Sequence, residues 1–479
     1  MKKIISLSML LCLLLSALVS CGEAAVETET DTVSVTDTET EKETKTETEP
    51  ETEEDVKDKK MQRYFIYRIW NFRPRQFDNV KKTVDSALAA GFTAIKIHMP
   101  WHRVEDENGN INYDEFDKIF DYVINEKGVK AAVSIDFARR YGDKMLSDDE
   151  LMRDMSGKLC VGDVQYERAA LSFSSETATA KAVSFYEKAV KHFNDKYGDN
   201  ILLYLPAFTQ YCETEYWCAG QYDYSVCAIN AFRNSLKEKF GTVDKLNEAT
   251  KKSFDSFETV EAPACSSTDA LGVLWYNFRH DQLKAFIDRL AEAQKRAAPD
   301  SKLALQLGSV FDEASNLRCT LRFADLCEHA DVLWIDDAPL YDHDFSMDYV
   351  RSSLPDGVII AQEIDGPLQA FASPEAYLAQ GLKSFQRGAV IMSAANWEID
   401  DNFNRYKDVW KQISETWLSD ETPEVIEITA DSPTLKISVY DMFKRKSPSG
   451  FITKYNKALK NAPAVKIIVT DDMEEHEAK

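Results

Sequence analysis

Short apolar runs alternate with longer segments of helical periodicity along most of this chain. Between the runs, apolar residues recur at intervals of three and four, as in "FDNVKKTVDSALAAG" and "YNFRHDQLKAFIDRLAEAQKRAA", which predicts amphipathic helices. The runs themselves are of strand length. They occupy residues 64–70, 93–99, 130–136, 201–208, 303–308, 331–336, 357–363 and 389–394.

The alternation predicts an α/β fold in which helices wrap a parallel sheet. Eight strand–helix units favour a closed (β/α)₈ TIM barrel over residues 61–418, and active sites of such barrels lie at the C-terminal ends of the strands. A doubly wound open sheet is the alternative. It usually has a glycine-rich first turn that binds phosphate, and the segment after the first run has none.

The last part of the chain, residues 419–479, follows the final predicted barrel helix and has a pattern of its own. "EVIEITADSPTLKISVYDMF" is typical of two strands, "GFITKYNKALKN" of a helix and "AVKIIVTD" of a final strand. We therefore expect a small C-terminal appendage that is α+β or β-rich.

The N-terminal segment is typical of an exported protein. Lys2 and Lys3 precede an apolar run over residues 4–18, which is short for a membrane span. The run ends in Leu-Val-Ser-Cys-Gly, which resembles the bacterial lipoprotein signal. This resemblance implies that residues 1–21 are a signal peptide, that Cys21 is lipidated, and that the protein is anchored at the bacterial cell surface. An ordinary secretory signal is the alternative.

Residues 22–60 are nearly all Glu, Asp, Thr and Lys. Such a segment has too little apolar surface to recover the entropy of ordering, so we expect a disordered tether that like charges keep extended. The tether carries much of the net charge of −24. An acidic chain lacks the positive surface that nucleic acid requires, so nucleic acid is excluded as a partner. The oligomeric state stays open.

The cysteines give no sign of a metal or redox site. The chain has nine, and seven remain after Cys12 and Cys21 of the signal segment. None of the seven forms a C-x-x-C pair, so most are expected to be small buried side chains. A metal at the cluster of Cys212, Cys218 and Cys227 is the alternative to our prediction of no metal and no cofactor.

Polar, ionisable and aromatic side chains gather where the predicted strands end. Because these ends share one face of a barrel, we expect them to line a common site. Aromatic rings stack on the C–H faces of sugars, and polar groups bond sugar hydroxyls, so the substrate class is an oligosaccharide or polysaccharide. The candidate substrate-binding residues are Arg68, Trp70, Asn71, His98, Trp101, His102, Asp136, Gln210, Tyr216, Gln306, Asp336, Tyr341 and Trp397.

Three glutamates at strand ends are the catalytic candidates. Cleavage of a glycosidic bond needs two carboxyl groups, one as acid and one as nucleophile or base. Glu213 and Glu215 follow the fourth run in "LPAFTQYCETEYW", and Glu363 ends the seventh. We expect strands four and seven to face one another across the barrel, so that the pair flanks a bound sugar. Their surroundings must then separate their pKa values.

Two segments resemble known glycosidases. "PWHRVEDENGNINYDEFDKIFDYV" is similar to the segment after strand two in the large barrel clan of retaining glycosidases. "AFRNSLKEKFGTVDKLNEATKKSFDSFETVEAP" resembles the stretch that follows the catalytic acid in family 42 β-galactosidases. The resemblance implies a (β/α)₈ glycoside hydrolase with Glu363 as nucleophile, Trp397 after strand eight, and a β-galactoside as the default substrate.

The acid position departs from the pattern of that family. There the acid follows an Asn in Asn-Glu-Tyr, whereas Thr214 precedes Glu215 here. The other register, Glu213 in Glu-x-x-Tyr, is similar to the acid-bearing element of β-amylases. Strand parity points both glutamates the same way, and we favour Glu213 because it is nearer the strand and better placed for partial desolvation.

The missing Asn leaves the stereochemistry open, with Gln210 as a candidate substitute. A carboxylate separation of about 5–5.5 Å indicates retention and about 6.5–9.5 Å inversion. Two further functions also stay open. A non-catalytic glycan-binding lipoprotein would have a barrel without a working catalytic pair. A solute-binding lipoprotein of a transporter would have two lobes, which the eight-unit pattern disfavours.

Overall fold

The computed structural model describes the body of the chain from Arg63 onward, with gaps. The predicted signal peptide, Cys21 and the tether lie outside the described residues. No helix among those residues is long and apolar enough to cross a membrane. The described residues are 63–69, 76–140, 142, 144–160, 168–209, 211–336, 342–365, 373–395, 401–419, 424–445 and 447–477.

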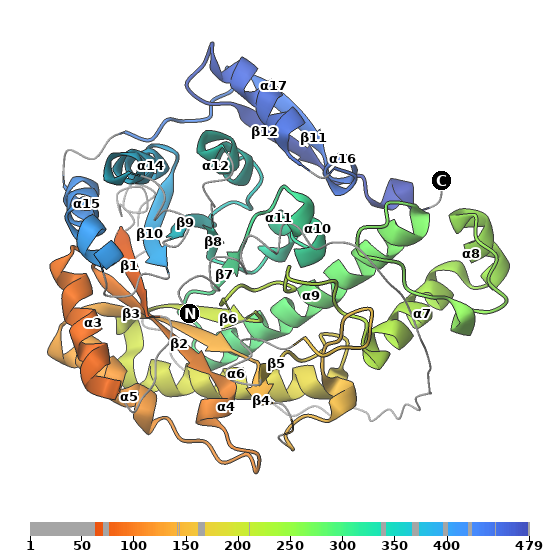
Figure 1. Ribbon diagram of the computed structural model, residues 1–479, viewed down its shortest axis with the longest axis horizontal. Helices are drawn as coiled ribbons and strands as arrows, with labels where there is room; N and C mark the ends of the chain where they lie inside the picture. Colours follow the sequence, from red (N-terminus) through yellow and green to blue (C-terminus); the bar gives the residue numbers. More distant parts are fainter. Residues whose placement is uncertain are drawn as a thin grey trace, which may run out of the picture.

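A parallel sheet of eight strands forms the centre of the molecule (Figure 1). In the order of the sheet, the strands are β6, β3, β2, β1, β10, β9, β8 and β7, and a bridge from Tyr204 to Leu303 brings its two ends together. The strands are β1 (Tyr64–Ile69), β2 (Ala94–Pro100), β3 (Lys130–Asp136), β6 (Ile201–Ala207), β7 (Ala304–Leu307), β8 (Val332–Asp336), β9 (Ile359–Asp365) and β10 (Ala389–Ala395).

This arrangement confirms the predicted (β/α)₈ TIM barrel. Each predicted strand is present within two residues at either end. The strands could be located because both of their faces are buried, which makes them continuous apolar runs.

Helices surround the sheet (Figure 1). Several begin at a Ser or Asp whose side chain accepts a hydrogen bond from the first turn, as Ser175, Ser225 and Asp269 do. The helices are α3 (Phe77–Ala89), α4 (Trp101–Val104), α5 (Asp114–Phe120), α6 (Glu176–Tyr197), α7 (Val226–Phe240), α8 (Val243–Thr250), α9 (Ala270–Ala297), α10 (Glu313–Arg318), α11 (Phe323–Leu326), α12 (His343–Arg351), α14 (Pro374–Gln386) and α15 (Asp401–Leu418).

Shorter elements join these. A π-helical segment, Asp121–Glu126, extends α5, and β4 (Arg139–Arg140) pairs antiparallel with β5 (Arg168–Ala169). Turns of 3₁₀ helix lie at Asp148–Glu150, Gly198–Asn200, Phe257–Thr259 and Glu474–His476.

Alternate strand residues fill the interior of the barrel. Its buried apolar cluster includes Ile66, Ala94, Ala361 and Ile391. Two residues further along each of these strands, the same face carries charged or polar side chains. These are Arg68 on β1, Lys96 on β2, Glu363 on β9 and Ser393 on β10, and all four are buried. The pleat of the strands therefore delivers a polar layer near their C-terminal ends.

The C-terminal appendage is a parallel pair of strands with two helices. It consists of β11 (Thr434–Ser438), α16 (Val439–Phe443), α17 (Ser449–Leu459) and β12 (Lys466–Thr470). The prediction of two strands in 424–443 was wrong, because β11 is the only strand there. Ser438 accepts a hydrogen bond from the amide of Asp441 and so begins a helix where the sequence pattern indicated a strand.

Candidate active site

The carboxylate of Glu363 is held at the end of β9 by three neighbouring side chains. Arg68 Nη1 lies 3.1 Å from Oε1, and Gln306 Nε2 donates to the same oxygen at 3.4 Å. Ser393 donates to Oε2 at 3.3 Å. Glu363 is only 2% exposed, so these contacts from β1, β7 and β10 fix the orientation of a desolvated carboxylate.

Lys96 supplies a second buried cation beside Arg68. Its Nζ donates to the side-chain oxygen of Gln306 and lies 4.3 Å from the centroid of the Trp334 ring. Burial lowers the pKa of Lys96 to about 8, and the positive charge of Arg68 acts in the same direction. A lysine with this pKa is a cation over much of the neutral range.

Two carboxylates act on both of these cations. Burial lowers the pKa of Arg68, but the negative charges of Cys212, Glu363 and Glu213 outweigh it and leave that pKa raised. The same three groups oppose the lowering of the Lys96 pKa. Glu363 and Glu213 therefore share one electrostatic environment around Arg68 and Lys96.

Glu213 follows β6 in a short loop. The amides of Phe208 and Thr209 both donate to the carbonyl of Glu213, at 2.8 and 3.1 Å. These two bonds hold the backbone of Glu213 against the end of β6. The Thr209 hydroxyl donates to Oε2 of the Glu213 carboxylate, and the residue stays partly exposed. Glu213 thus combines a fixed oxygen with access to solvent.

Glu215 has different surroundings. It is 2% exposed, and Arg318 Nε lies 2.8 Å from Oε1 while the Gly308 amide donates to Oε2 at 2.9 Å. Burial raises the pKa of Glu215, with Arg318 opposing the rise. Protein donors contact both oxygens. Our expectation that Glu213 is the more desolvated glutamate was wrong.

The loop also explains why strand parity does not describe this segment. Phe208 and Thr209 bond to the Glu213 carbonyl instead of continuing the strand, and the Thr214 amide then donates to the Gln306 carbonyl at 2.6 Å. In addition, β7 and β8 separate β6 from β9 around the barrel, and β10 lies across from β6. The expectation that strands four and seven face one another directly was therefore wrong, although both end in the same polar layer.

Cys212, His98 and Asp136 form a chain of contacts in this layer. Cys212 Sγ lies 2.9 Å from His98 Nδ1, and His98 Nε2 lies 3.3 Å from Asp136 Oδ2. Arg68 donates to the carbonyl of Tyr211, the residue before Cys212. The loop after β6 is therefore tied to the ends of β1, β2 and β3.

Three predicted substrate-binding residues lie outside this cluster. Trp101 is fully buried, stacked on Phe185 at 5.4 Å between ring centroids. Tyr216 is buried and donates to the Arg279 carbonyl at 3.3 Å. His102 lies partly buried in α4, 3.4 Å from the Ala138 carbonyl. Trp101 and Tyr216 are buried, so their rings pack in the core of the protein.

The structure brings together Arg68, His98, Asp136, Gln306 and Glu363 of the predicted site. Asp336 ends β8, and its side chain is outside the described part of the chain. The remaining predicted residues, also outside the described part, are Trp70, Asn71, Gln210, Tyr341 and Trp397.

Sequence reasoning missed Lys96, Ser393, Arg318 and the contacts of Cys212. Lys96 had a usable signal, because it precedes His98 by two positions in an otherwise apolar strand. Ser393 had a signal of the same kind, because it is a polar residue in the apolar run of residues 389–394. Arg318 and the contacts of Cys212 had none, since they depend on distant segments. Within the described residues no group of three His, Cys, Asp or Glu is arranged to hold a metal ion.

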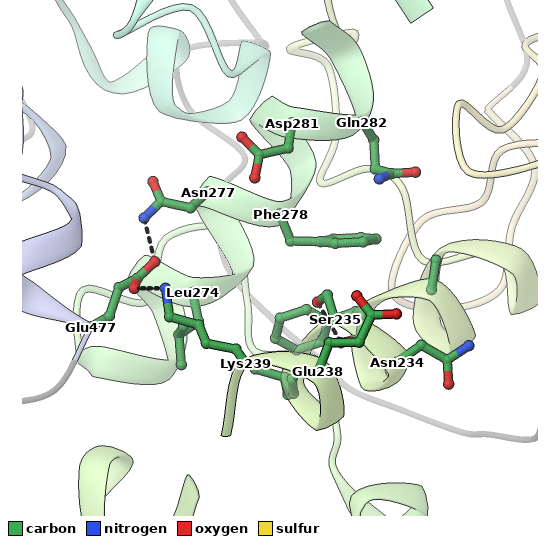
Figure 2. Close-up of a pocket in the computed structure, with 13 residues that line it drawn as sticks. Asn234, Ser235, Glu238, Lys239, Leu274, Asn277, Phe278, Asp281, Gln282 and Glu477 are labelled. Atoms are coloured by element: carbon green, nitrogen blue, oxygen red, sulfur yellow. Dashed lines mark hydrogen bonds and ion pairs between the residues drawn. The ribbon is translucent and has the colours of Figure 1, made fainter. Parts of the chain in front are cut away.

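A separate cavity of about 400 Å³ lies between α7, α9 and the end of the chain (Figure 2). Figure 2 shows Glu477 at one side of it, bonded to Asn277 at 2.8 Å and paired with Lys239. None of the predicted site residues that the structure describes lines this cavity. It is distinct from the polar layer at the strand ends.

A family model described as beta-galactosidase, that of glycoside hydrolase family 42, matches residues 71–346, more than half of the sequence. The chain belongs to glycoside hydrolase family 42. The matched span of this family 42 chain includes Glu213 and Glu215 and ends before β9, so Glu363 lies beyond it.

Solved structures show the same fold. The chain is 15% identical to the beta-galactosidase of the psychrophilic Marinomonas ef1, with a TM-score of 0.64 over 85% of this chain and 70% of that one. The beta-galactosidase of Bacillus circulans sp. alkalophilus is 15% identical, with a TM-score of 0.65 over 88% of this chain and 67% of that one. The catalytic domain of the Paenibacillus polymyxa beta-amylase is also 15% identical, with a TM-score of 0.58 over 76% of this chain and 99% of that one. Family and fold together identify a glycoside hydrolase with a TIM barrel.

Proposed function

We propose that this family 42 protein cleaves O-glycosidic bonds with Glu363 as nucleophile and Glu213 as general acid. The observation that carries the proposal is the shared environment of the two carboxylates around Arg68 and Lys96. A β-galactoside is the proposed substrate, because the family model and two similar structures are described as beta-galactosidases.

In the proposed reaction, Glu213 protonates the leaving-group oxygen while Glu363 attacks the anomeric carbon. Water then hydrolyses the glycosyl–enzyme bond with Glu213 as general base, so the configuration is retained. Arg68, Gln306 and Ser393 keep the Glu363 carboxylate oriented, and the partly exposed Glu213 can reach a bound sugar.

Glu215 is the rival acid, since burial raises its pKa. A general acid must present an oxygen to the leaving group. Arg318 and the Gly308 amide contact both oxygens of Glu215, whereas one oxygen of Glu213 is bonded to Thr209. This difference supports Glu213 as the acid and a structural role for Glu215.

The test compares the wild type with Glu363→Gln on a panel of aryl glycosides and oligosaccharides. We expect aryl β-galactosides to be cleaved by the wild type and the variant to lose at least about a hundredfold in rate. Glu475→Gln makes the same chemical change at an exposed position and should keep full activity. Sugar binding without cleavage by any of the three proteins would instead indicate a non-catalytic glycan-binding barrel.

We also propose that Cys21 is lipidated and anchors the enzyme at the bacterial cell surface. The support is the lipoprotein-like signal at residues 1–21 and the acidic segment that follows it. In cell fractionation, the wild type should sediment with membranes and Cys21→Ser should not carry lipid. Equal membrane association and no lipid on either protein would contradict the anchor.

A further inference from the structure

Cys212 is held in an unusual backbone conformation beside a cationic cluster. Its φ of 79° lies in the left-handed region, which residues other than glycine rarely adopt. This conformation places Sγ 2.9 Å from His98 Nδ1. A buried thiol is usually an inert apolar group, whereas the Cys212 thiol has polar and charged neighbours.

The groups that face Cys212 come from several strands. Arg68 lies on β1, Lys96 and His98 lie on β2, and all three favour a negative charge on the sulfur. Glu213 is next in the chain, and Glu363 on β9 acts on the same two cations, Arg68 and Lys96. The cations that favour a negative charge on the sulfur thus come from β1 and β2.

His98 is positioned to act as the counter-ion. Burial lowers the pKa of His98, but the charge of Cys212 and the bond to Asp136 outweigh burial and hold it above its usual value. Asp136 is fully buried, and its Oδ1 accepts the Ala138 amide at 2.8 Å. Asp136 therefore holds the imidazole through Nε2, and in the imidazolium form Nδ1–H points toward the sulfur, the arrangement of an activated thiol nucleophile.

The same contacts set the charge of the thiol. Burial raises the pKa of Cys212, while Arg68, His98 and Lys96 together outweigh it and lower that pKa to about 6. In contrast, burial raises the pKa of Cys160, Cys319 and Cys327 to about 12.

We propose that Cys212 is a modification site, a reactive thiolate that attacks small electrophiles such as hydrogen peroxide selectively. In the reaction with peroxide, Sγ attacks one oxygen, an S–O bond forms and the O–O bond breaks. The sulfur is oxidised by two electrons to a sulfenic acid, and the leaving hydroxide takes the proton of the His98 imidazolium to become water. Peroxide is the oxidant, so the step is balanced without a cofactor.

Modification would also affect hydrolysis, and this consequence rests on the proposed function. The sulfur shares Arg68 with Glu363. An added group on Sγ removes the negative charge of the thiolate and adds bulk next to that guanidinium. We expect the glycosidase activity to fall at the same rate as Cys212 is modified.

The experiment uses iodoacetamide on the full folded chain and maps each labelled cysteine by mass spectrometry. Sγ attacks the methylene carbon, an S–C bond forms, the C–I bond breaks and iodide leaves. The expected labelling rate of Cys212 is nearly constant from pH 8.5 to about 6.5, because a thiol with a lowered pKa stays ionised there.

Cys227 is the internal control. It is partly exposed, its Sγ lies 3.3 Å from the Asp149 carbonyl, and burial raises its pKa. Its labelling should fall about tenfold for each pH unit below its pKa. The ratio of Cys212 to Cys227 labelling should therefore rise on acidification by about tenfold per unit.

Asp136→Asn removes the charge that orients His98. We expect labelling of Cys212 at pH 6.5 to drop at least about threefold while Cys227 labelling is unchanged, which shows that the fold is kept. The proposal is overturned if Cys212 of the folded chain is not labelled, or is labelled with the same pH dependence as Cys227. Both readouts are independent of activity, so they stand even if the protein cleaves no sugar.

Discussion

Glu213 and Glu215 are two residues apart, yet only Glu213 presents a carboxylate that is partly open to solvent. Glu215 is paired with Arg318 beneath Gly308, where a Cβ atom would lie 2.7 Å from the Arg318 Cζ. The absence of a side chain at residue 308 is what lets the guanidinium reach Glu215. At the scale of single residues, Gly308 thus allows Arg318 to pair with Glu215, and Glu213, in its proposed role as the acid, has no such partner among the described residues.

Matched variants separate these two roles. Glu213→Gln should lower kcat/KM by about 10²–10⁴-fold, because it removes the proton donor. Glu215→Gln should keep kcat/KM within a few-fold but lower the free energy of unfolding by about 3 kcal/mol, because it leaves Arg318 without its buried carboxylate. Steady-state kinetics measures kcat/KM, and urea unfolding measures the free energy of unfolding. A larger rate loss in Glu215→Gln would assign the acid to Glu215.

At the same scale, the sequence located residues whose positions follow from strand periodicity. Arg68, His98, Asp136 and Glu363 lie at predicted strand ends and meet in one polar layer. It could not place Cys212 against His98, because that contact requires a positive φ in an irregular loop. Trp101 was misread for a related reason, since an aromatic residue after a strand can also turn into the core.

At the scale of elements, one buried carboxylate joins the C-terminal appendage to the barrel. Asp348 of α12 is fully buried, and its Oδ2 accepts the Tyr455 hydroxyl at 2.6 Å and the Val465 amide at 2.9 Å. The guanidinium of Arg387, which follows α14, contacts both oxygens at 2.9 Å. One side chain therefore links α12, α14, α17 and the start of β12.

Removing this link should loosen the appendage. Asp348→Asn removes one of the two carboxylates that pair with the buried Arg387, the other being Asp344, so we expect a loss of about 3 kcal/mol in the free energy of unfolding. Hydrogen exchange should rise most over residues 434–470. The control Asp356→Asn changes an exposed carboxylate of the same segment and should stay within about 0.5 kcal/mol. Equal effects of the two variants would show that the link contributes nothing.

Elements with strong periodicity were predictable from the sequence, and the appendage shows the limit. The apolar runs of the barrel strands are buried on both faces, so their existence could be predicted. In the structure, residues 424–443 contain a half-buried strand, β11, and then a helix, α16, which Ser438 caps. Alternation over so few residues does not distinguish these two structures.

At the scale of the whole molecule, closure of the barrel brings the two proposed catalytic carboxylates into one layer. β6 and β9 are separated by β7 and β8, and the side chains that link their ends come from β1, β2 and β7. The charges of both carboxylates act on Arg68 and on Lys96. The proposed chemistry is thus a property of the closed sheet.

Trapping of a glycosyl–enzyme intermediate tests this account most directly. An activated 2-deoxy-2-fluoro-β-galactoside would be added to enzyme whose turnover of an aryl β-galactoside has been established. The labelled peptide would then be sequenced by mass spectrometry. We predict a single covalent adduct on Glu363, which Glu363→Gln lacks. An adduct on another residue, or continued turnover with no adduct at all, would contradict the assignment of Glu363 as the nucleophile.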